Sequence, residues 1–148
     1  MIEFTLTRTT TASAEAVFDR LTDHASYASM TPLRSSVLER EGVPAPNGVG
    51  ARRRLGLVGP PMVEEVVSYE RPGLFAYRLV SGLPVRDHVG TVSLTATLDG
   101  GTRVEYHVVS TPRLRIPGIG VVLGLVLKQA ISGLLDGVVK AAEADAKA

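Results

Sequence analysis

The sequence predicts an α+β domain in which one antiparallel sheet is wrapped around a single long C-terminal helix. Residues 119–146 have an unbroken helical period, and about six strand-like segments follow one another before them. An opening strand and two short helical segments come first. A meander of strands has one apolar face to bury, and only the last helix is long enough to cover it. At 148 residues, we expect a single domain over 1–148.

The segment 119–146 has the most regular pattern in the chain. At 3.6 residues per turn, its polar residues fall on one side and its apolar residues on the other. One apolar flank consists of small residues, among them Ala130, Gly133 and Gly137. Each glycine costs a helix interior about 1 kcal/mol relative to alanine, so these positions need a reason. The two alternatives are close packing of the helix on the sheet and empty volume left for a ligand.

The other elements follow in order along the chain. Residues 2–9 alternate in polarity as a strand does, Ser13 caps a short helix, and 24–30 form a second short helical piece. Gly, Pro and Asn residues over 42–50 indicate a loop. Six further strands are expected over 35–41, 51–57, 61–69, 74–80, 88–98 and 102–110.

The inner faces of strands 51–57 and 61–69 depend on the loop between them. A three-residue loop at 58–60 sets Arg53 opposite Glu65 on the largely apolar face. Two charges out of water cost several kcal/mol each unless they are paired and hydrogen-bonded, and folding does not require them there. An inward Arg53 and Glu65 therefore indicate a polar cavity or a ligand head group. The alternative is that the faces are reversed or that both side chains reach the rim.

Three more polar side chains are expected on the inner face of the sheet. Tyr106 shares the apolar face of its strand, and matching that face to the next strand places Tyr77 near Gly90, with His88 in the same region. A buried tyrosine needs a partner for its hydroxyl. These three side chains can supply that partner for one another, for a ligand or for a trapped water. An inward histidine is more often a satisfied core residue than a catalyst.

Composition excludes several classes of function. The formal charge of +1 gives no footprint for nucleic acid, and the absence of cysteine excludes disulfides, thiolate metal sites and a cysteine nucleophile. Three dispersed histidines, of which His24 and His107 are expected at the surface, make a poor metal site, and no cofactor motif is present. The N-terminus alternates like a strand, and the apolar run 116–127 is too short to span a bilayer. We expect a cytoplasmic protein with no metal, cofactor, nucleic acid or integral membrane segment.

Several individually weak motifs run along nearly the whole chain in a characteristic order. They are Ser13-Ala-Glu-Ala-Val-Phe-Asp, Met30-Thr-Pro, Gly48-Val-Gly-Ala, Glu64-Glu-Val-Val, Arg71-Pro-Gly-Leu-Phe-Ala-Tyr, Ser81-Gly-Leu-Pro and Gly100-Gly-Thr-Arg-Val, followed by the long helix. This order resembles the START-related, polyketide-cyclase/dehydrase-like superfamily (SRPBCC), which shares the helix-grip fold of the major birch-pollen allergen.

The resemblance implies a seven-stranded antiparallel sheet that grips the terminal helix around a cavity. Members bind lipids, sterols, polyketides, plant hormones or isoprenoid quinones, and some are cyclases or aromatases. No catalytic set is common to the superfamily, so no residue role is carried over. Where members have tryptophan near the Met30-Thr-Pro position and in the last strand, this chain has none. That difference argues against a ligand held by an indole.

We expect the chain to bind a small, largely apolar molecule, such as a lipid, polyketide or isoprenoid, between the sheet and the small-residue flank of the last helix. The residues expected at this site are Tyr27, Met30, Arg53, Glu65, Tyr77, His88, Tyr106, Ala130, Gly133 and Gly137. The alternative is a cyclase or dehydratase that uses Glu65 or His88 as its acid/base.

A third hypothesis is an interaction module. The first two turns of the last helix, with Val121, Val122 and Leu125, are apolar on every side and must be covered. The loops of the chain itself are the expected cover, and a homodimer partner is the alternative.

Overall fold

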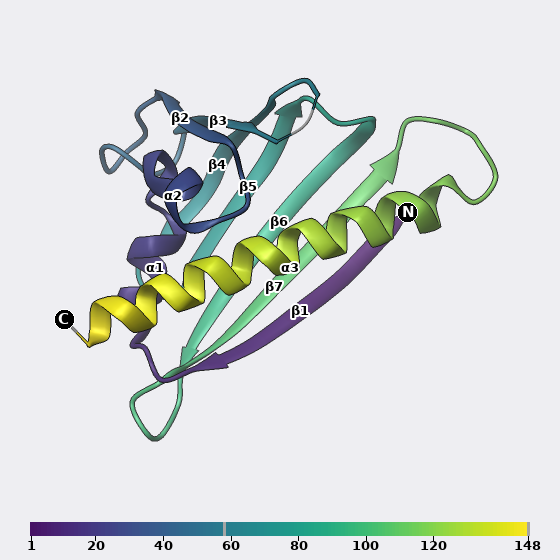
Figure 1. Ribbon diagram of the computed structural model, residues 1–148. Helices are drawn as coiled ribbons and strands as arrows, with labels where there is room; N and C mark the ends of the chain where they lie inside the picture. The colour runs from purple at the N-terminus through teal and green to yellow at the C-terminus, as the bar shows by residue number, and fades with distance from the viewer. Residues whose placement is uncertain (58, 148) are drawn as a thin grey trace.

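The computed structural model describes residues 1–57 and 59–147, so Val58 of the expected three-residue loop lies outside the described residues. The strands form one seven-stranded antiparallel sheet in the order β1-β7-β6-β5-β4-β3-β2, and α3 lies across one face of it (Figure 1). The predicted fold class is confirmed. The elements are β1 (Ile2–Thr10), α1 (Ala14–Leu21), the 3₁₀ turn η1 (His24–Ser26), α2 (Tyr27–Met30), β2 (Ser35–Arg40), β3 (Arg52–Gly56), β4 (Met62–Glu70), β5 (Leu74–Ser81), β6 (Val85–Ala96), β7 (Thr102–Pro112) and α3 (Ile119–Ala146).

The helix α1 begins at the predicted cap and holds the far end of α3. The Ser13 hydroxyl accepts a hydrogen bond from the Ala16 amide at 3.2 Å, which satisfies one of the free donors of the first turn. Phe18 and Leu21 are buried on the inner face of α1, which packs on α3. At the end of α3, the Arg20 guanidinium donates two hydrogen bonds to the Asp145 carboxylate, at 2.6 and 2.7 Å.

The last hairpin has Tyr106 on its inner face, as predicted. Val92 lies opposite Tyr106 on the strands β6 and β7. On the neighbouring strand, Tyr77 lies opposite Gly90. A Cβ at Gly90 would lie 2.5 Å from the Tyr77 ring, so this glycine makes room for the inward tyrosine. The pattern of alternation therefore gives the correct inner face for β5, β6 and β7.

The hairpin of β3 and β4 differs from the prediction by one residue. Arg53 lies opposite Glu64, not opposite Glu65 as expected. The strands stop at Gly56 and resume at Met62, so the connection is longer than the predicted 58–60. Since side chains alternate along a strand, a shift of one residue exchanges the faces of the two glutamates. Glu64 is buried on the inner face, and Glu65 lies on the outer face.

The helix α3 covers the sheet but is held unevenly along its length. By length and composition alone it could cross a membrane. In the structure it lies along the sheet, and its buried residues come from the later turns, from Leu127 to Ala142. Its N-cap is Gly118, with a left-handed φ of 81° and no side-chain hydrogen bond to the first turn. The start of α3 therefore has fewer attachments than its end.

Candidate functional site

A cavity of about 360 Å³ lies between the inner face of the sheet and α3. Most of its lining is apolar and comes from β3, β4, the loops and α3. The polar groups gather on the sheet side, where Arg53, Glu64, Tyr77, His88 and Tyr106 line it. On α3, the exposed residues Gln129 and Ala130 also belong to the lining, so the cavity opens beside this turn of the helix.

A buried ion pair forms part of the sheet side of the cavity. The Arg53 Nη2 atom lies 2.7 Å from the Glu64 Oε1 atom, and the two side chains are only 3% and 8% exposed. Arg53 Nη1 donates a hydrogen bond to the Nδ1 atom of His24 at 3.0 Å. Because a guanidinium only donates, His24 carries its proton on Nε2, which donates to the Asn47 carbonyl at 3.2 Å.

The position of His24 corrects the expectation that it lies at the surface. Its side chain is completely buried under the sheet. Burial and the positive charge of Arg53 lower the pKa of His24 to about 3, so its imidazole is neutral. The turn η1 carries this histidine inward, where it acts as a fixed acceptor for Arg53.

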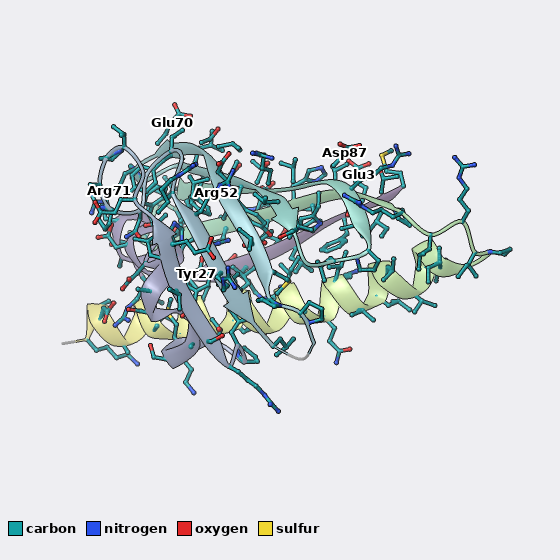
Figure 2. All side chains as sticks on the ribbon, turned by 90° about the horizontal axis from the view of Figure 1, so that it is seen from above. Glu3, Tyr27, Arg52, Glu70, Arg71 and Asp87 are labelled. Atoms are coloured by element: carbon teal, nitrogen blue, oxygen red, sulfur yellow. The ribbon has the colours of Figure 1, made fainter. Side chains whose placement is uncertain are left out.

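Aromatic rings enclose the guanidinium of Arg53. Its Cζ atom lies 4.8 Å from the ring centroid of Tyr27 and 4.9 Å from that of Tyr77, close enough for cation–π attraction. Tyr27 is buried, its hydroxyl donates to the Leu21 carbonyl, and it lies on the side of the sheet that faces α3 (Figure 2). Among the described residues, Tyr27 is not part of the cavity lining. Its ring contacts the Arg53 guanidinium without facing the cavity.

Two tyrosines and a histidine complete the polar part of the lining. The hydroxyl oxygens of Tyr77 and Tyr106 lie 2.5 Å apart, so each tyrosine satisfies the other. Burial raises the pKa of both phenols, which keeps them protonated. The Nδ1 atom of His88 lies 3.1 Å from the Ser110 hydroxyl, and burial lowers the pKa of His88. These groups offer neutral donors and acceptors.

The sequence matches the family described as "Polyketide cyclase / dehydrase and lipid transport" over residues 1–143. The chain belongs to this family. A comparison with curated proteins found no match.

Several solved structures have the same fold as this family member. A START superfamily protein from Mycobacterium smegmatis has a TM-score of 0.74 at 15% identity, with 98% of this chain and 97% of that chain covered. The di-domain ARO/CYC StfQ from the steffimycin biosynthetic pathway has a TM-score of 0.79 at 16% identity, over 99% of this chain and 52% of that chain. A protein from Thermus thermophilus, TTHA0849, has a TM-score of 0.76 at 20% identity, over 97% and 98% of the two chains. At these identities the similarity concerns the fold alone.

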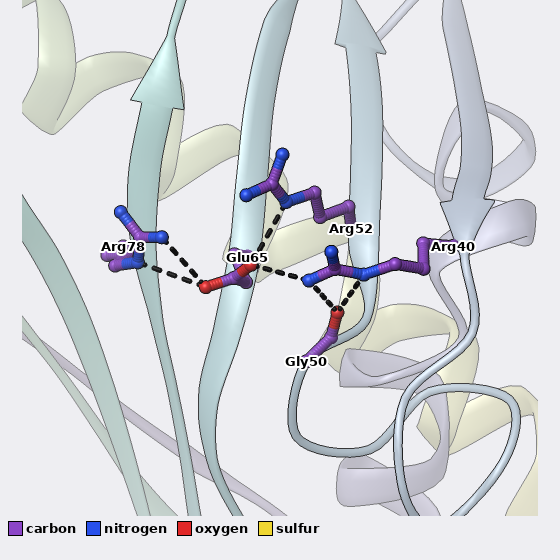
Figure 3. Close-up of polar contacts among 5 residues, drawn as sticks. All are labelled: Arg40, Gly50, Arg52, Glu65 and Arg78. Carbon is purple, nitrogen blue, oxygen red and sulfur yellow. Dashed lines mark hydrogen bonds and ion pairs between the residues drawn. The ribbon is translucent and has the colours of Figure 1, made fainter.

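In this family member, Glu65 lies outside the cavity. It accepts hydrogen bonds from Arg40 at 2.7 Å, Arg52 at 3.0 Å and Arg78 at 2.9 Å on the outer face of the sheet (Figure 3). The hydrogen bonds from Arg52 and Arg78 lower the pKa of Glu65 to about 2. The expectation that Glu65 lines the site, as a ligand contact or as an acid/base, is corrected by the register of β3 and β4. Its place is taken by Glu64.

The two glycines Gly133 and Gly137 of α3 have different surroundings. Ala130 and Gly133 line the cavity, and a Cβ at Gly133 would meet only the ring of Pro32, at 3.6 Å. A Cβ at Gly137 would lie 2.1 Å from the carbonyl oxygen of Met30. Gly137 therefore permits close packing of α3 on α2. Met30 and Gly137 contact each other, and neither belongs to the cavity lining.

Sequence reasoning missed two members of the buried cluster, for different reasons. Alternation along β4 places either Glu64 or Glu65 on the inner face, and only the length of the connection between β3 and β4 decides which of them it is. No local signal indicates His24, because its partner Arg53 is 29 residues away and belongs to another element. Six expected residues do line the cavity: Arg53, Tyr77, His88, Tyr106, Ala130 and Gly133.

Proposed function

We propose that this protein binds a small, largely apolar molecule, such as a lipid, polyketide or isoprenoid, in the cavity between the sheet and α3. The observation that supports the proposal is the division of the cavity into apolar walls and a compact polar end. Pockets for small molecules usually have this form, in which apolar surface gives affinity and a few polar groups fix orientation. The family to which the chain belongs has a description that includes polyketide chemistry and lipid transport.

The size of the cavity favours a molecule of moderate size. Ligand pockets generally have volumes of roughly 300–1,000 Å³. At about 360 Å³, this cavity falls near the lower limit. A ring system or a short isoprenoid fits this volume better than a lipid with two full acyl chains.

The charges at the polar end favour a neutral ligand. The guanidinium of Arg53 is already paired with Glu64, so the buried cluster has no net charge to offer an anion. A carboxylate or phosphate on the ligand would place a second negative charge beside Glu64 in a site of low dielectric constant. Carbonyl and hydroxyl oxygens are better partners for Tyr77, Tyr106 and His88.

We place the protein in the cytoplasm, since the lack of cysteine leaves no disulfide that requires an oxidising compartment.

Mass spectrometry of organic extracts from the purified protein tests this proposal. We expect an apolar compound to copurify with the wild-type chain and to be lost from Gly133→Leu, whose side chain fills the cavity beside Pro32. Ala144→Leu adds the same side chain at an exposed position on the same helix and serves as the control. The neutral fluorescent probe N-phenyl-1-naphthylamine gives a second readout. Equal probe binding by wild type and Gly133→Leu, with no compound in either extract, would refute cavity binding.

A second candidate function is acid–base catalysis of a cyclase or dehydratase type at His88. The neutral imidazole lines the cavity, and its ring centroid lies 6.1 Å from that of Tyr77. A neutral imidazole can take a proton from a bound substrate, and a phenol can donate one. We expect wild-type protein to convert the copurified compound on prolonged incubation and His88→Gln to bind it without conversion. Equal conversion by both proteins would rule out His88 as the acid/base.

A further inference from the structure

The surface at the start of α3 is unusually apolar. We use the term α3-start surface for six large apolar side chains, each between 47% and 69% exposed: Leu114, Ile116, Val121, Val122, Leu125 and Val126. The expectation that loops of the chain cover this region is wrong, because the described part of the chain leaves all six in contact with solvent. Exposed apolar patches of this kind mark interaction surfaces.

The core does not need these side chains. In α3, Val121, Val122, Leu125 and Val126 recur with the spacing of one helical face, and that face points away from the sheet. The opposite face of the helix is directed at the sheet, and Leu127 is its first buried residue. From Lys128 onward the outward face carries polar side chains, as a solvated helix does. The apolar outward face is therefore confined to the first two turns.

Positive charges border the α3-start surface. No aspartate or glutamate occurs between Glu105 and Asp136, whereas Arg113, Arg115 and Lys128 fall within that stretch. Near the start of β6, Arg86 lines one hollow together with Arg113 and Arg115. Two acidic residues lie close to these basic ones (Figure 2): Asp87 lines a hollow with Arg86 and Arg113, and Glu3 lines a hollow with Val121, Leu125 and Lys128. The balance of charge around the surface is positive.

We propose that the α3-start surface docks on an anionic lipid bilayer. Apolar side chains that enter the interface, bordered by Lys and Arg that meet lipid phosphates, are the combination that interfacial binding requires. A second copy of the chain is a poorer occupant. In a two-fold contact the same patch meets itself, which would bring Arg113, Arg115 and Lys128 of both copies together. The bilayer supplies the negative charge that a second copy lacks.

The docking site lies next to the mouth of the cavity. Gln129 and Ala130, which line the cavity and are exposed, follow Leu125 and Val126 by about one turn of α3. A docked protein would hold this mouth at the membrane interface. An apolar molecule would then pass between the bilayer and the cavity without crossing water. This inference goes beyond ligand binding, and its test requires no cavity ligand.

Vesicle flotation tests the docking of the purified full chain. We expect wild-type protein to float with vesicles of phosphatidylcholine mixed with phosphatidylglycerol, to float less with phosphatidylcholine alone, and to be released by added salt. Val122→Asp combined with Leu125→Asp should abolish flotation. Arg115→Gln should reduce partitioning into the anionic vesicles by about fivefold and leave the weak binding to neutral vesicles unchanged.

The control is Leu98→Asp, which introduces an aspartate at a fully exposed apolar residue outside the α3-start surface. Leu98 lies in the turn between β6 and β7, at the opposite end of β7 from the start of α3 (Figure 1). It should float like wild type, and circular dichroism should show all variants folded. Equal flotation of wild type and the double variant would overturn the proposal. So would a wild-type dimer by light scattering that Leu125→Asp dissociates while no vesicle binding is seen.

Discussion

Arg53 is held by four different side chains at the polar end of the cavity. Glu64 neutralises it, His24 accepts a hydrogen bond from it, and the rings of Tyr27 and Tyr77 lie against its guanidinium. Each contact comes from a different segment of the chain. The orientation of the Arg53 guanidinium therefore depends on the packing of η1, α2, β4 and β5.

The two adjacent glutamates should differ sharply in their contribution to stability. Glu64→Gln leaves Arg53 charged and buried without an anion, and we expect it to lower the free energy of unfolding by about 3–5 kcal/mol. Glu65→Gln changes partners whose side chains are 34–54% exposed, so a loss of about 1 kcal/mol is expected. Urea denaturation of both variants measures the difference. Similar losses would contradict the assignment of Glu64 to the inner face.

His24 should make the stability depend on pH. Its pKa is about 3 in the folded chain, below the value of about 6.5 for an unfolded histidine. Between these values the unfolded state binds a proton that the folded state excludes, so stability falls as the pH drops. From pH 6 to pH 4 the loss from this group should be about 2–3 kcal/mol. His24→Gln keeps an acceptor for Arg53 and should show a shallower pH dependence in urea denaturation. Parallel curves for wild type and variant would argue against a neutral His24.

Individual side chains were predictable where the local pattern decides their face. Tyr77, His88 and Tyr106 line the cavity, on the inner face that the apolar pattern of their strands predicts. Their contact with a ligand stays a prediction. Glu64 and His24 depend on a loop length and on a contact between distant segments, which alternation does not encode.

At the scale of elements, α3 has two glycines with opposite roles, and alanine distinguishes them. Gly133→Ala should stabilise the chain by about 0.5–1 kcal/mol, since alanine is the better helix former and its methyl group fits beside Pro32. Gly137→Ala should destabilise it by about 1–3 kcal/mol, since the new methyl group would meet the Met30 carbonyl, which is backbone and cannot rotate away. Thermal unfolding of both variants tests the pair. If both substitutions stabilised the protein, α2 would have to shift away from α3 at little cost, and close packing at Gly137 would be contradicted.

Most elements were predictable because their signals are local. The bounds of α3 agree at both ends, and Ser13 caps α1 as expected. The β3–β4 register was not predictable from charge, because Arg52, Arg53 and Arg54 lie opposite Glu65, Glu64 and Val63 in turn. Arginine meets glutamate in the expected register and in the observed one. The expected strand 88–98 also ended too late, since β6 stops at Ala96 and Leu98 is fully exposed.

At the scale of the whole molecule, α3 contributes both to the core and to the cavity. Its later turns bury the side chains that close the sheet, and its middle turns leave the cavity open at Gly133. The seven strands and the helix were predictable together, since a meander with a single long helix allows one arrangement that buries both apolar faces. The volume of the cavity was not predictable, because it depends on how closely α2 and Pro32 approach α3.

The weak start of α3 at Gly118 also determines how the molecule should move. With no side-chain cap and an outward face in solvent, the first turns should open locally without unfolding the sheet. Hydrogen exchange should therefore be fast at amides of 122–127 and slow at those of 131–142, where α1 and the Arg20–Asp145 pair hold the helix. Uniform exchange along α3 would contradict this. Because the opening segment ends beside Gln129, the rate of this fraying would set how quickly a molecule enters or leaves the cavity.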